Sequence, residues 1–359
     1  MASPLLQVGA VINFRYEVRG HLGGGTNGVV YEVFDLRQRE VSALKLLVGT
    51  PPTAVWEESA ILTQVGGDYL LPIRNADLAA GVPFIVTAVA TNGTIGKGMR
   101  AGVGVAPTQA ATWIQQASRG LARIHDLGLL HNDIKPENIF LGDDNQALVG
   151  DLGLACLRDT NGMGHFAGTL TTVAPEVALV GAAVPSSQWP SARPTSVASD
   201  IYSLAATFYM LVAGRPIHAF PSNDMVANFS IVANETPTDI RDVAPHVPKG
   251  LGATIMRALS KDPVNRPESA SALDAGIGSR PRQRRSWVRV APHPGHTSCF
   301  QGVRGGSKIE VCAIPTGTGT QHRIVCQHQV SGRKAANPTN VSRASALPRA
   351  LRVVLRDLA

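Results

Sequence analysis

Two stretches in the middle of the chain carry carboxylate, amide and ammonium groups at close spacing. Asp133, Lys135 and Asn138 lie in the run Leu-His-Asn-Asp-Ile-Lys-Pro-Glu-Asn-Ile-Phe, and Asp151 follows in Gly-Asp-Leu-Gly. Carboxylate and amide oxygens are ligands that Mg²⁺ prefers, and a carboxylate can also accept the proton of a hydroxyl group. Asp and Asn are common turn residues as well. The residue types therefore allow a metal site beside a proton acceptor, but they are equally typical of turns. The order of the motifs along the chain is needed to choose between a catalytic and a purely structural interpretation.

Nearer the N-terminus, a glycine cluster precedes a lysine. Gly23, Gly25 and Gly28 fit G-x-G-x-x-G-x-V between two expected strands, where missing side chains let backbone N–H groups approach phosphates. A glycine cluster in a hairpin is more often only a turn. Lys45 ends an apolar strand, where a buried ammonium needs an anionic partner, and Glu58 lies opposite the apolar stripe of the next expected helix. The cluster and the lysine together favour a phosphate site.

The order of these blocks resembles the eukaryotic-like (Hanks-type) serine/threonine protein kinases. Asp133 and Asn138 match the family's H-R-D-x-x-x-x-N loop, and Asp151 matches the Asp of D-F-G. The resemblance implies transfer of the ATP γ-phosphoryl group to protein Ser or Thr hydroxyls. Lys135, two residues after Asp133, is similar to the Ser/Thr-specific members.

The resemblance also assigns roles to residues. It implies Asp133 as catalytic base, with Lys135 and Lys45 as catalytic cations, and Asn138 and Asp151 as ligands of Mg²⁺, for which Mn²⁺ could substitute. The ATP-contacting residues are expected to be Gly23, Gly25, Gly28, Val30, Lys45, Glu58, Ala88 and Ala90.

Later blocks extend the resemblance over about 250 residues. Thr169 precedes Ala-Pro-Glu, which ends at Glu176, as at the end of a kinase activation segment. Asp200 resembles the helix residue that braces the catalytic loop, and Arg266 resembles the late arginine that pairs with Glu176. Five ordered blocks leave little room for the turn interpretation.

Three positions depart from the family pattern. Asn132 replaces the usual Arg, which docks a phosphorylated activation loop, so we expect activity that does not depend on loop phosphorylation. Leu152 replaces Phe in D-F-G, a substitution that should preserve packing. Ala88 replaces an acidic hinge residue, but its carbonyl and the Ala90 N–H would still serve adenine.

The expected architecture is α+β: a bilobal protein-kinase-like fold, with a β-rich N-terminal lobe and a helical C-terminal lobe. Alternating residues predict strands at 16–19, 29–34, 41–47, 69–73 and 83–89, and helical spacing predicts helices at 56–65, 108–127, 201–212 and 250–259. The segment 215–250 resists assignment. We expect a catalytic domain at 10–275, a basic linker at 276–286 and a small, β-rich module at 287–359.

The positive charge of the chain belongs to its last part. Residues 1–280 carry 20 Lys and Arg against 24 Asp and Glu, whereas residues 281–359 carry 13 against Glu310 and Asp357 alone. This asymmetry suggests polyanion binding by the tail, although a basic run is more often a solvated linker. Leu347, Leu351, Val354, Leu355 and Leu358 share one helical face, which predicts a short docking helix.

The tail is also rich in potential metal ligands. Its histidines and cysteines would furnish a zinc site, although their spacing matches no common zinc module and structural roles are the simpler interpretation. These residues are His293, His296, Cys299, Cys312, His322, Cys326 and His328.

Two alternatives to a kinase signalling enzyme remain. One is a pseudokinase that binds nucleotide as a scaffold, and the other gives the main function to the basic tail. Protein substrates and autophosphorylation are the expected partners and reaction of the enzyme. Without a signal-peptide pattern or a long apolar stretch, we expect no transmembrane segment and a cytoplasmic location.

Overall fold

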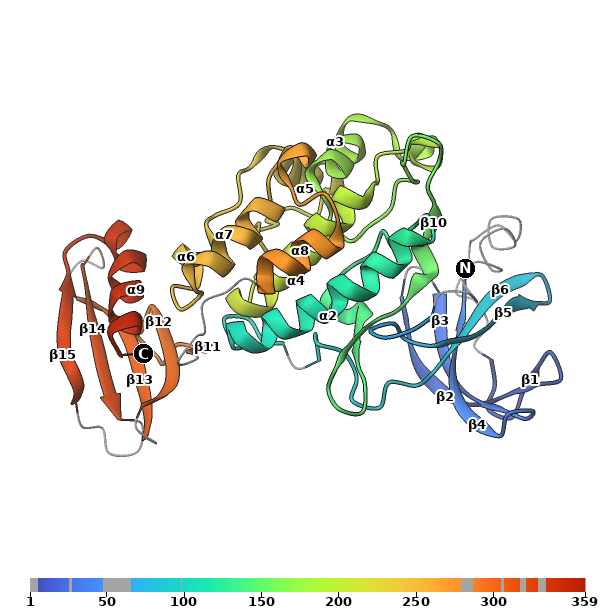
Figure 1. Cartoon of the computed structure of the whole chain (residues 1–359), viewed down its shortest axis with the longest axis horizontal. Coiled ribbons are helices and arrows are strands. Elements are labelled where there is room, and N and C mark those ends of the chain that lie inside the picture. The colour runs from blue at the N-terminus through green and yellow to red at the C-terminus, as the bar shows by residue number, and fades with distance from the viewer. Residues whose placement is uncertain are drawn as a thin grey trace.

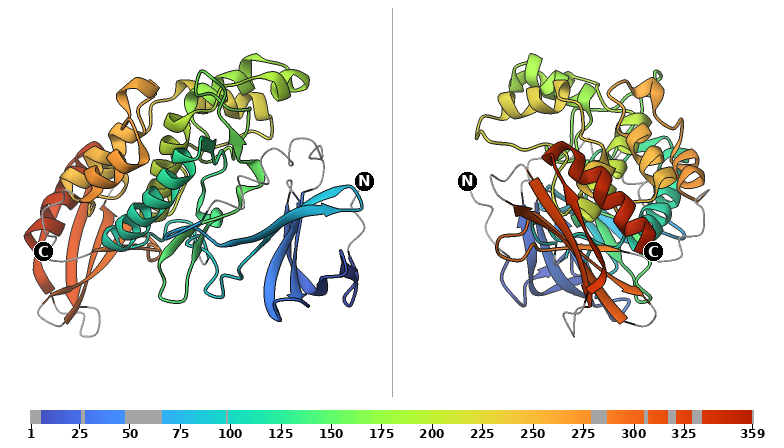
Figure 2. Two further views of the ribbon diagram at one scale, coloured as in Figure 1. Left: turned by 45° about the vertical axis from the view of Figure 1, so that its right-hand side comes forward. Right: turned by 90° about the vertical axis from the view of Figure 1, so that its left-hand side faces the viewer.

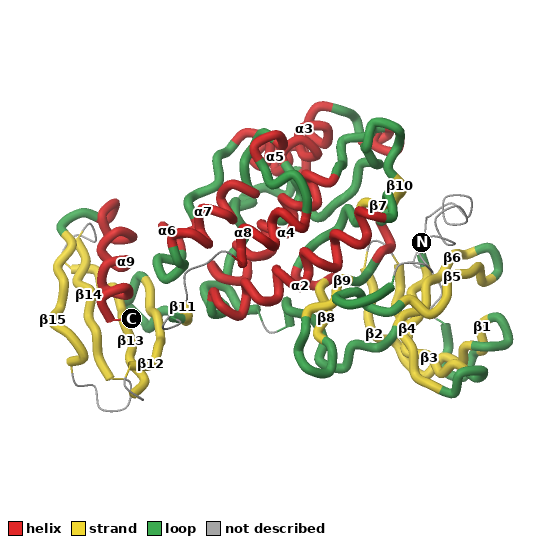
Figure 3. Tube along the Cα trace, in the orientation of Figure 1, coloured by secondary structure: helices red, strands yellow, loops and turns green. Residues whose placement is uncertain are grey.

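The computed structural model describes residues 6–25, 28–47, 66–97, 99–278, 287–304, 307–316, 321–328 and 334–358. Three regions follow one another along the longest axis: an N-terminal sheet, a helical region and a C-terminal module (Figure 1). The helical region lies between the other two, so the sheet and the module are at opposite ends of the molecule (Figure 3).

The N-terminal sheet is antiparallel, with strand order β1-β2-β3-β4-β6-β5. Its strands are β1 Val11–Ile12, β2 Tyr16–Gly25, β3 Gly28–Asp35, β4 Glu40–Leu46, β5 Ile73–Ala79 and β6 Val82–Thr87. Alternate side chains form a core of their own on one face, which includes Tyr16, Tyr31, Val33, Leu44 and Phe84. The alternation of apolar and polar residues in the sequence therefore corresponds to burial of one face of this sheet.

Two expectations for this region need comment. The strand predicted at 69–73 is wrong, because β5 begins only at Ile73. The residues before it pair with β9 (Ala147–Val149) instead: Leu70 forms a bridge to Val149, and the Leu71 N–H donates to the Val149 carbonyl at 2.8 Å. The helix predicted at 56–65 lies outside the described residues.

The helical region contains the helices predicted at 108–127, 201–212 and 250–259. Its helices are α2 Pro107–Asp126, α3 Pro175–Ala183, α4 Val197–Ala213, α5 Met225–Asn234, α6 Ile240–Val243, α7 Lys249–Ala258 and α8 Ala270–Gly278. Short strands accompany them: β7 Leu129–Leu130, β8 Ile139–Leu141, β9 Ala147–Val149 and β10 Cys156–Leu157. No helix in the described ranges is both long and apolar enough to cross a membrane.

Helix α4 is the central element of this region. From Ser199 to Ala213 every residue is buried, which explains why its sequence is apolar nearly all round. At its start Ser199 Oγ accepts a hydrogen bond from the Ser196 N–H at 2.8 Å. At its end Gly214 adopts φ +66°, and a Cβ there would lie 2.6 Å from the Val103 nitrogen, so glycine is required.

The C-terminal module is an antiparallel five-stranded sheet in sequential order, covered by one helix. Its elements are β11 Val288–Val290, β12 Ser298–Arg304, β13 Ser307–Thr316, β14 Gln321–His328, β15 Lys334–Val341 and α9 Leu347–Leu358. Leu347, Leu351 and Leu355 pack with Trp287 and Phe300 in the core between helix and sheet. The apolar face of α9 is therefore covered by the module's own sheet, and the expectation of a docking helix that uses this face is wrong.

The module contacts the helical region through a few specific residues. Arg289 Nη1 donates to the carbonyls of Ala213 (3.3 Å) and Val243 (3.2 Å), and the Arg289 carbonyl accepts from the Gly104 N–H at 2.8 Å. The ring of His246 lies 5.1 Å from that of Phe300. In the left view of Figure 2 the module (red and orange) lies at the far end of the helical region from the N-terminal sheet (blue), and Arg352 of α9 donates to Asp242 of α6 at 3.0 Å.

Candidate active site

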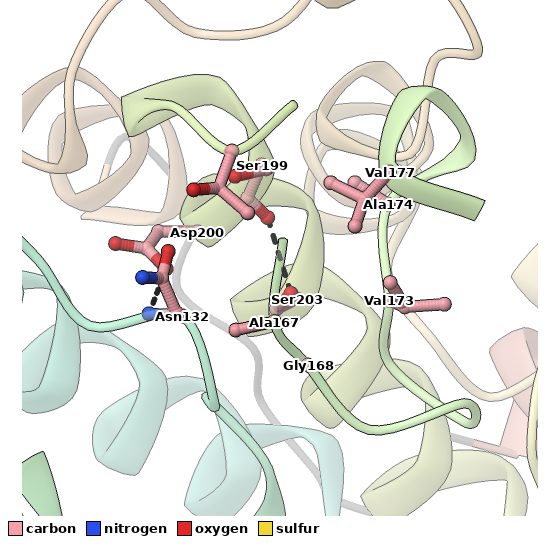
Figure 4. Close-up of a pocket in the computed structure, with 10 residues that line it drawn as sticks. Asn132, Ala167, Gly168, Val173, Ala174, Val177, Ser199, Asp200 and Ser203 are labelled. Carbon is pink, nitrogen blue, oxygen red and sulfur yellow. Dashed lines mark hydrogen bonds between the residues drawn. The ribbon is translucent and has the colours of Figure 1, made fainter. Parts of the chain in front are cut away.

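The carboxylate of Asp200 supports the backbone of the loop between β7 and β8. Asp200, in the first turn of α4, accepts a hydrogen bond from the backbone N–H of Asn132 at 2.9 Å (Figure 4). It also accepts from the backbone N–H of His131 at 2.9 Å and lies 2.9 Å from His125 Nε2. Asn132 adopts φ +66°, a conformation that needs such support. Burial would raise the pKa of Asp200, but the hydrogen bonds from His125 and the His131 amide outweigh it and hold that pKa below its usual value.

Asp133 lies at the centre of a polar network. Its Oδ1 accepts from Thr169 Oγ1 at 2.5 Å, and its Oδ2 accepts from Lys135 Nζ at 2.7 Å. The Asn138 amide donates to Asp133 Oδ2 at 3.0 Å and to its carbonyl at 2.7 Å. Only 4% of Asp133 is exposed. The Asp133 carboxylate is thus held in a fixed orientation, and its Oδ1 accepts a hydrogen bond from a hydroxyl group, that of Thr169.

The next loop joins this network to the N-terminal sheet. Asp151, after β9, has φ +60°, and its Oδ1 lies 2.5 Å from Lys45 Nζ on β4. The neighbouring Gly150 N–H donates to the Asn138 carbonyl at 3.0 Å, so the backbone that carries Asp151 lies beside that of Asn138. A Cβ at Gly153 would lie 3.1 Å from Lys45 Nζ, so glycine leaves room for the ion pair.

The glycine cluster forms the closed end of the β2–β3 hairpin. Gly23 pairs with Val30, and Gly25 pairs with Gly28, while residues 26 and 27 lie outside the described ranges. Gly28 has φ +136°, and a Cβ there would lie 1.9 Å from the Leu46 carbonyl. No side chain fits at Gly28, so only glycine can bring the backbone this close to Leu46.

Ala88 and Ala90 follow β6, at the passage from the sheet to the helical region. The Ala88 N–H donates to the Pro72 carbonyl at 2.9 Å, and the Ala90 carbonyl accepts from Gly93. Within the described ranges, the Ala88 carbonyl and the Ala90 N–H make no hydrogen bond to another backbone group. These are the two groups expected to meet adenine. Glu58 lies outside the described residues, and its pairing with Lys45 stays a prediction.

Asn132, the main departure from the family pattern, makes contacts of its own. Its side-chain Nδ2 donates to the Leu154 carbonyl at 3.1 Å and lies 3.2 Å from Cys156 Sγ. The loop between β7 and β8 is thereby tied to the segment that follows Asp151. Leu152 is 7% exposed and packs in the hydrophobic core that contains the buried residues of α2 and α4, as expected for a residue that replaces a buried Phe.

A small pocket lies behind this loop. Its lining joins the catalytic loop and the end of the activation segment to α4, with Asn132 and Asp200 on one side and Val173 and Val177 on the other (Figure 4). The lining contains neither Lys45 nor Asp151. This pocket is therefore distinct from the ATP site expected from the sequence.

The late arginine forms the expected ion pair. Arg266 Nη1 and Nη2 donate to Glu176 Oε1 and Oε2, both at 2.7 Å. The Arg266 side chain is fully buried and also donates to the carbonyls of Ala198, Ser260 and Lys261. This bidentate pair anchors the end of the activation segment to the helical region.

Sequence reasoning missed two histidines of the site. His125, in the last turn of α2, supports Asp200, and His131 Nε2 lies 2.9 Å from the Gly150 carbonyl. A histidine on the largely apolar inner face of a helix was the available signal for His125. Only the fold shows that it faces a buried carboxylate from another helix.

Comparison with known proteins agrees with this geometry. The family model described as protein kinase domain matches residues 16–276, so the chain belongs to the protein kinase family. The DNA damage-responsive serine/threonine-protein kinase RqkA of Deinococcus radiodurans is 30% identical over 283 residues, which cover 75% of this chain and 40% of that protein.

Two further relatives come from mycobacteria. Serine/threonine-protein kinase PknE of Mycobacterium tuberculosis is 25% identical over 269 residues, covering 72% of this chain and 45% of PknE. Serine/threonine-protein kinase PknK of Mycobacterium bovis is 31% identical over 292 residues, covering 76% of this chain and 24% of PknK. The chain thus matches less than half of the length of each of these relatives.

Proposed function

We propose that this protein is a serine/threonine protein kinase that transfers the γ-phosphoryl group of Mg-ATP to protein hydroxyls. The observation that carries the proposal is the connected set of polar groups in which Lys45 pairs with Asp151, and Asp133 with Lys135 and Asn138. The N-terminal sheet and the helical region would act as the two lobes of a kinase, with ATP between them. A pseudokinase is disfavoured because none of these groups is missing.

The hairpin end and the lysine would bind the nucleotide. Backbone N–H groups at Gly23, Gly25 and Gly28, beside Val30, would cover the phosphates, and Lys45 would neutralise the α- and β-phosphates, with Glu58 orienting it. The Ala88 carbonyl and the Ala90 N–H would bind the adenine edge.

The metal-binding residues fit Mg²⁺ by their donor atoms. The Asn138 amide nitrogen is used by Asp133, which leaves its oxygen for a cation, and Asp151 uses one oxygen for Lys45 and keeps the other. Mg²⁺, or Mn²⁺, would supply neutralisation of the phosphate charge there.

Asp133 would orient the attacking hydroxyl group and accept its proton. The bond between the γ-phosphorus and the β,γ-bridging oxygen breaks, a bond from the substrate oxygen to that phosphorus forms, and ADP leaves. The hydrogen bond from Thr169 Oγ1 to Asp133 Oδ1 supports this role, because a serine or threonine hydroxyl of a substrate would use the same oxygen. Lys135 would stabilise the charge on the transferred group.

The test is phosphate transfer by the purified chain with Mg-ATP and generic acceptor proteins, beside Asp133→Asn. We expect transfer by the wild type and a loss of at least about 10²-fold in the variant. Autophosphorylation is read in the same assay without acceptor. Nucleotide binding with no transfer by either form would support the scaffold alternative.

The domain limits belong to this proposal: a catalytic domain at 10–275, a linker at 276–286 and the module at 287–359. Signalling through protein substrates is the role that such a domain would serve. For the module we also propose zinc, on ligands independent of the kinase site. Polyanion binding by the tail gains little support, because the Arg289 guanidinium donates to carbonyls of the helical region and Arg352 is paired with Asp242 at 3.0 Å.

A further inference from the structure

Two thiols face each other in the middle of the C-terminal module. Cys299 on β12 is directly opposite Cys312 on β13, and their sulfur atoms are 2.8 Å apart. They are 0% and 2% exposed, and neither forms a disulfide. Adjacent strands of an antiparallel pair thus present two buried soft ligands at one point.

Two imidazoles reach the same point from the turn before β12. His293 and His296 are joined by a backbone hydrogen bond of 2.9 Å across this turn, in which Gly295 adopts φ +81°. His296 Nδ1 lies 3.4 Å from Cys299 Sγ. A ring nitrogen of His293 and the sulfur atoms of Cys299 and Cys312 all lie within 4.8 Å of one another. Three donors therefore lie together, and a ring nitrogen of His296 is close to one of them, the Cys299 sulfur.

A buried carboxylate orients one of these rings. Glu310 on β13 is 4% exposed, its Oε2 lies 3.0 Å from His293 Nε2, and Gln301 Nε2 donates to its Oε1 at 3.2 Å. A histidine that ligates a metal commonly gives its other ring nitrogen to such a carboxylate. With Nε2 held by Glu310, the other ring nitrogen, Nδ1, would be the one that binds the metal. The contact also gives a use to one of only two acidic residues after residue 280.

We propose that His293, His296, Cys299 and Cys312 bind one zinc ion in a tetrahedral, structural site, with Glu310 as a positioning residue. Zinc binds thiolate sulfur at about 2.3 Å and imidazole nitrogen at about 2.0–2.1 Å, which sets donor atoms about 3.3–3.8 Å apart. The 3.4 Å between His296 and Cys299 fits this spacing. The two sulfur atoms must separate by about 1 Å, and their two thiol protons pass to solvent on binding.

The other candidates named from the sequence do not join this group. Cys326 belongs to the apolar core between the sheet and α9. His322 Nε2 lies 3.0 Å from Thr297 Oγ1. A disulfide between Cys299 and Cys312 is the competing chemistry, for which the sulfur atoms, 2.8 Å apart, would need to approach to about 2.05 Å. A disulfide gives no role to the two histidines or to Glu310, whereas zinc uses all three.

The site would strengthen a small structural unit. Zinc would fix the turn before β12 to the two strands that carry the thiols, beside Phe300, whose ring contacts His246 of the helical region. Small modules with limited apolar cores commonly need such a link. The metal would therefore support both the module and its contact with the kinase domain.

The experiment measures metal in the full chain, purified without chelators after expression with zinc. We expect about one equivalent of zinc in the wild type and less than about a tenth in Cys299→Ser and Cys312→Ser, whereas Cys156→Ser, which changes a buried cysteine outside the module, keeps it. His296→Asn should lose most of the metal, with His328→Asn as its control. Glu310→Gln should weaken zinc affinity about 10- to 100-fold.

A second measurement guards against variants that fail to fold. Wild-type protein stripped with a chelator is titrated with Co²⁺, and one equivalent should produce the visible absorption and thiolate charge-transfer bands of a tetrahedral site. Zinc below a tenth of an equivalent in the wild type, or a Cys299–Cys312 disulfide found by peptide mass after alkylation, would overturn the proposal. Asp133→Asn should retain its zinc, so failure of phosphate transfer and failure of metal binding are read separately.

Discussion

Lys45 Nζ and Asp151 Oδ1 form an ion pair of 2.5 Å across 106 positions of sequence. The pair is the direct link between β4 of the N-terminal sheet and the loop after β9. Its two side chains are 17% and 24% exposed, so a ligand can still reach them. The ammonium and the carboxylate thus fix each other's position at the edge of the N-terminal sheet.

Replacing either partner should remove activity and leave the fold intact. We expect Lys45→Met and Asp151→Asn each to lower the rate of phosphate transfer by about 10²-fold or more. Lys45→Met removes the positive charge that would neutralise the phosphates, and Asp151→Asn removes the negative charge that would bind the metal. Lys97→Met, at an exposed lysine, is the matched control and should keep wild-type activity. Thermal unfolding of all four proteins checks the fold. A Lys45→Met enzyme of normal rate would contradict the assigned role.

Thr169 should matter through its contacts rather than through phosphorylation. Thr169→Ala removes the hydroxyl that bridges Asp133 and Lys135, and we expect kcat to fall about tenfold or more. Thr171→Ala should have little effect, because Asn132, not an arginine, follows His131 and ties the loop directly to Leu154. Steady-state kinetics with dephosphorylated enzyme measures both. Strong activation by phosphate on Thr171 would refute independence from loop phosphorylation.

The Arg266–Glu176 pair should be important for stability. Arg266→Ala leaves a carboxylate and three carbonyls without their partner, and the free energy of unfolding should fall by about 3–5 kcal/mol. Arg257→Ala, at an exposed arginine with one hydrogen bond to the Asn265 carbonyl, should cost about 1 kcal/mol or less. Urea unfolding followed by fluorescence compares them. Equal midpoints for the two variants would show that the buried pair contributes little.

His246 should make stability depend on pH. Burial, with a smaller effect of the nearby Arg289 charge, lowers its pKa to about 3. Below about pH 6.5 the unfolded chain takes up a proton that the folded chain does not, so folding is weakened as the pH falls towards 3 and the cost is absent above 6.5. His246→Leu should therefore gain stability relative to the wild type by up to about 1.4 kcal/mol per pH unit below 6.5. Urea unfolding at pH 5, 6 and 7.5 checks this, and a constant difference between the proteins would contradict it.

The sequence was most informative where chemistry dictates both residue type and spacing. Asp133, Asn138 and Asp151 could be predicted as site residues because the motif fixes both their types and their spacing along the chain. The pairing of Arg266 with Glu176 and the bracing by Asp200 are confirmed by direct contacts. Nothing tests the catalytic roles themselves, which stay predictions.

The errors came from long-range pairing. Leu70 and Leu71 have strand-like residues, yet their backbone pairs with Val149, far along the chain, rather than extending β5. The leucines of α9 predicted an apolar face correctly, but not that the module's own sheet would cover it. Likewise, the convergence of His293 with Cys312 depends on the register of β12 and β13, which no local pattern specifies.

Helix α4 runs from the loop that carries Asp133 to the contact with the C-terminal module. Its first turn carries Asp200, on which the catalytic loop rests, and its last residue, Ala213, offers the carbonyl that Arg289 of the module binds. Its 17 residues form a rod of about 25 Å. The separation between the module and the proposed phosphate-transfer site is thus set by one largely buried helix of fixed length.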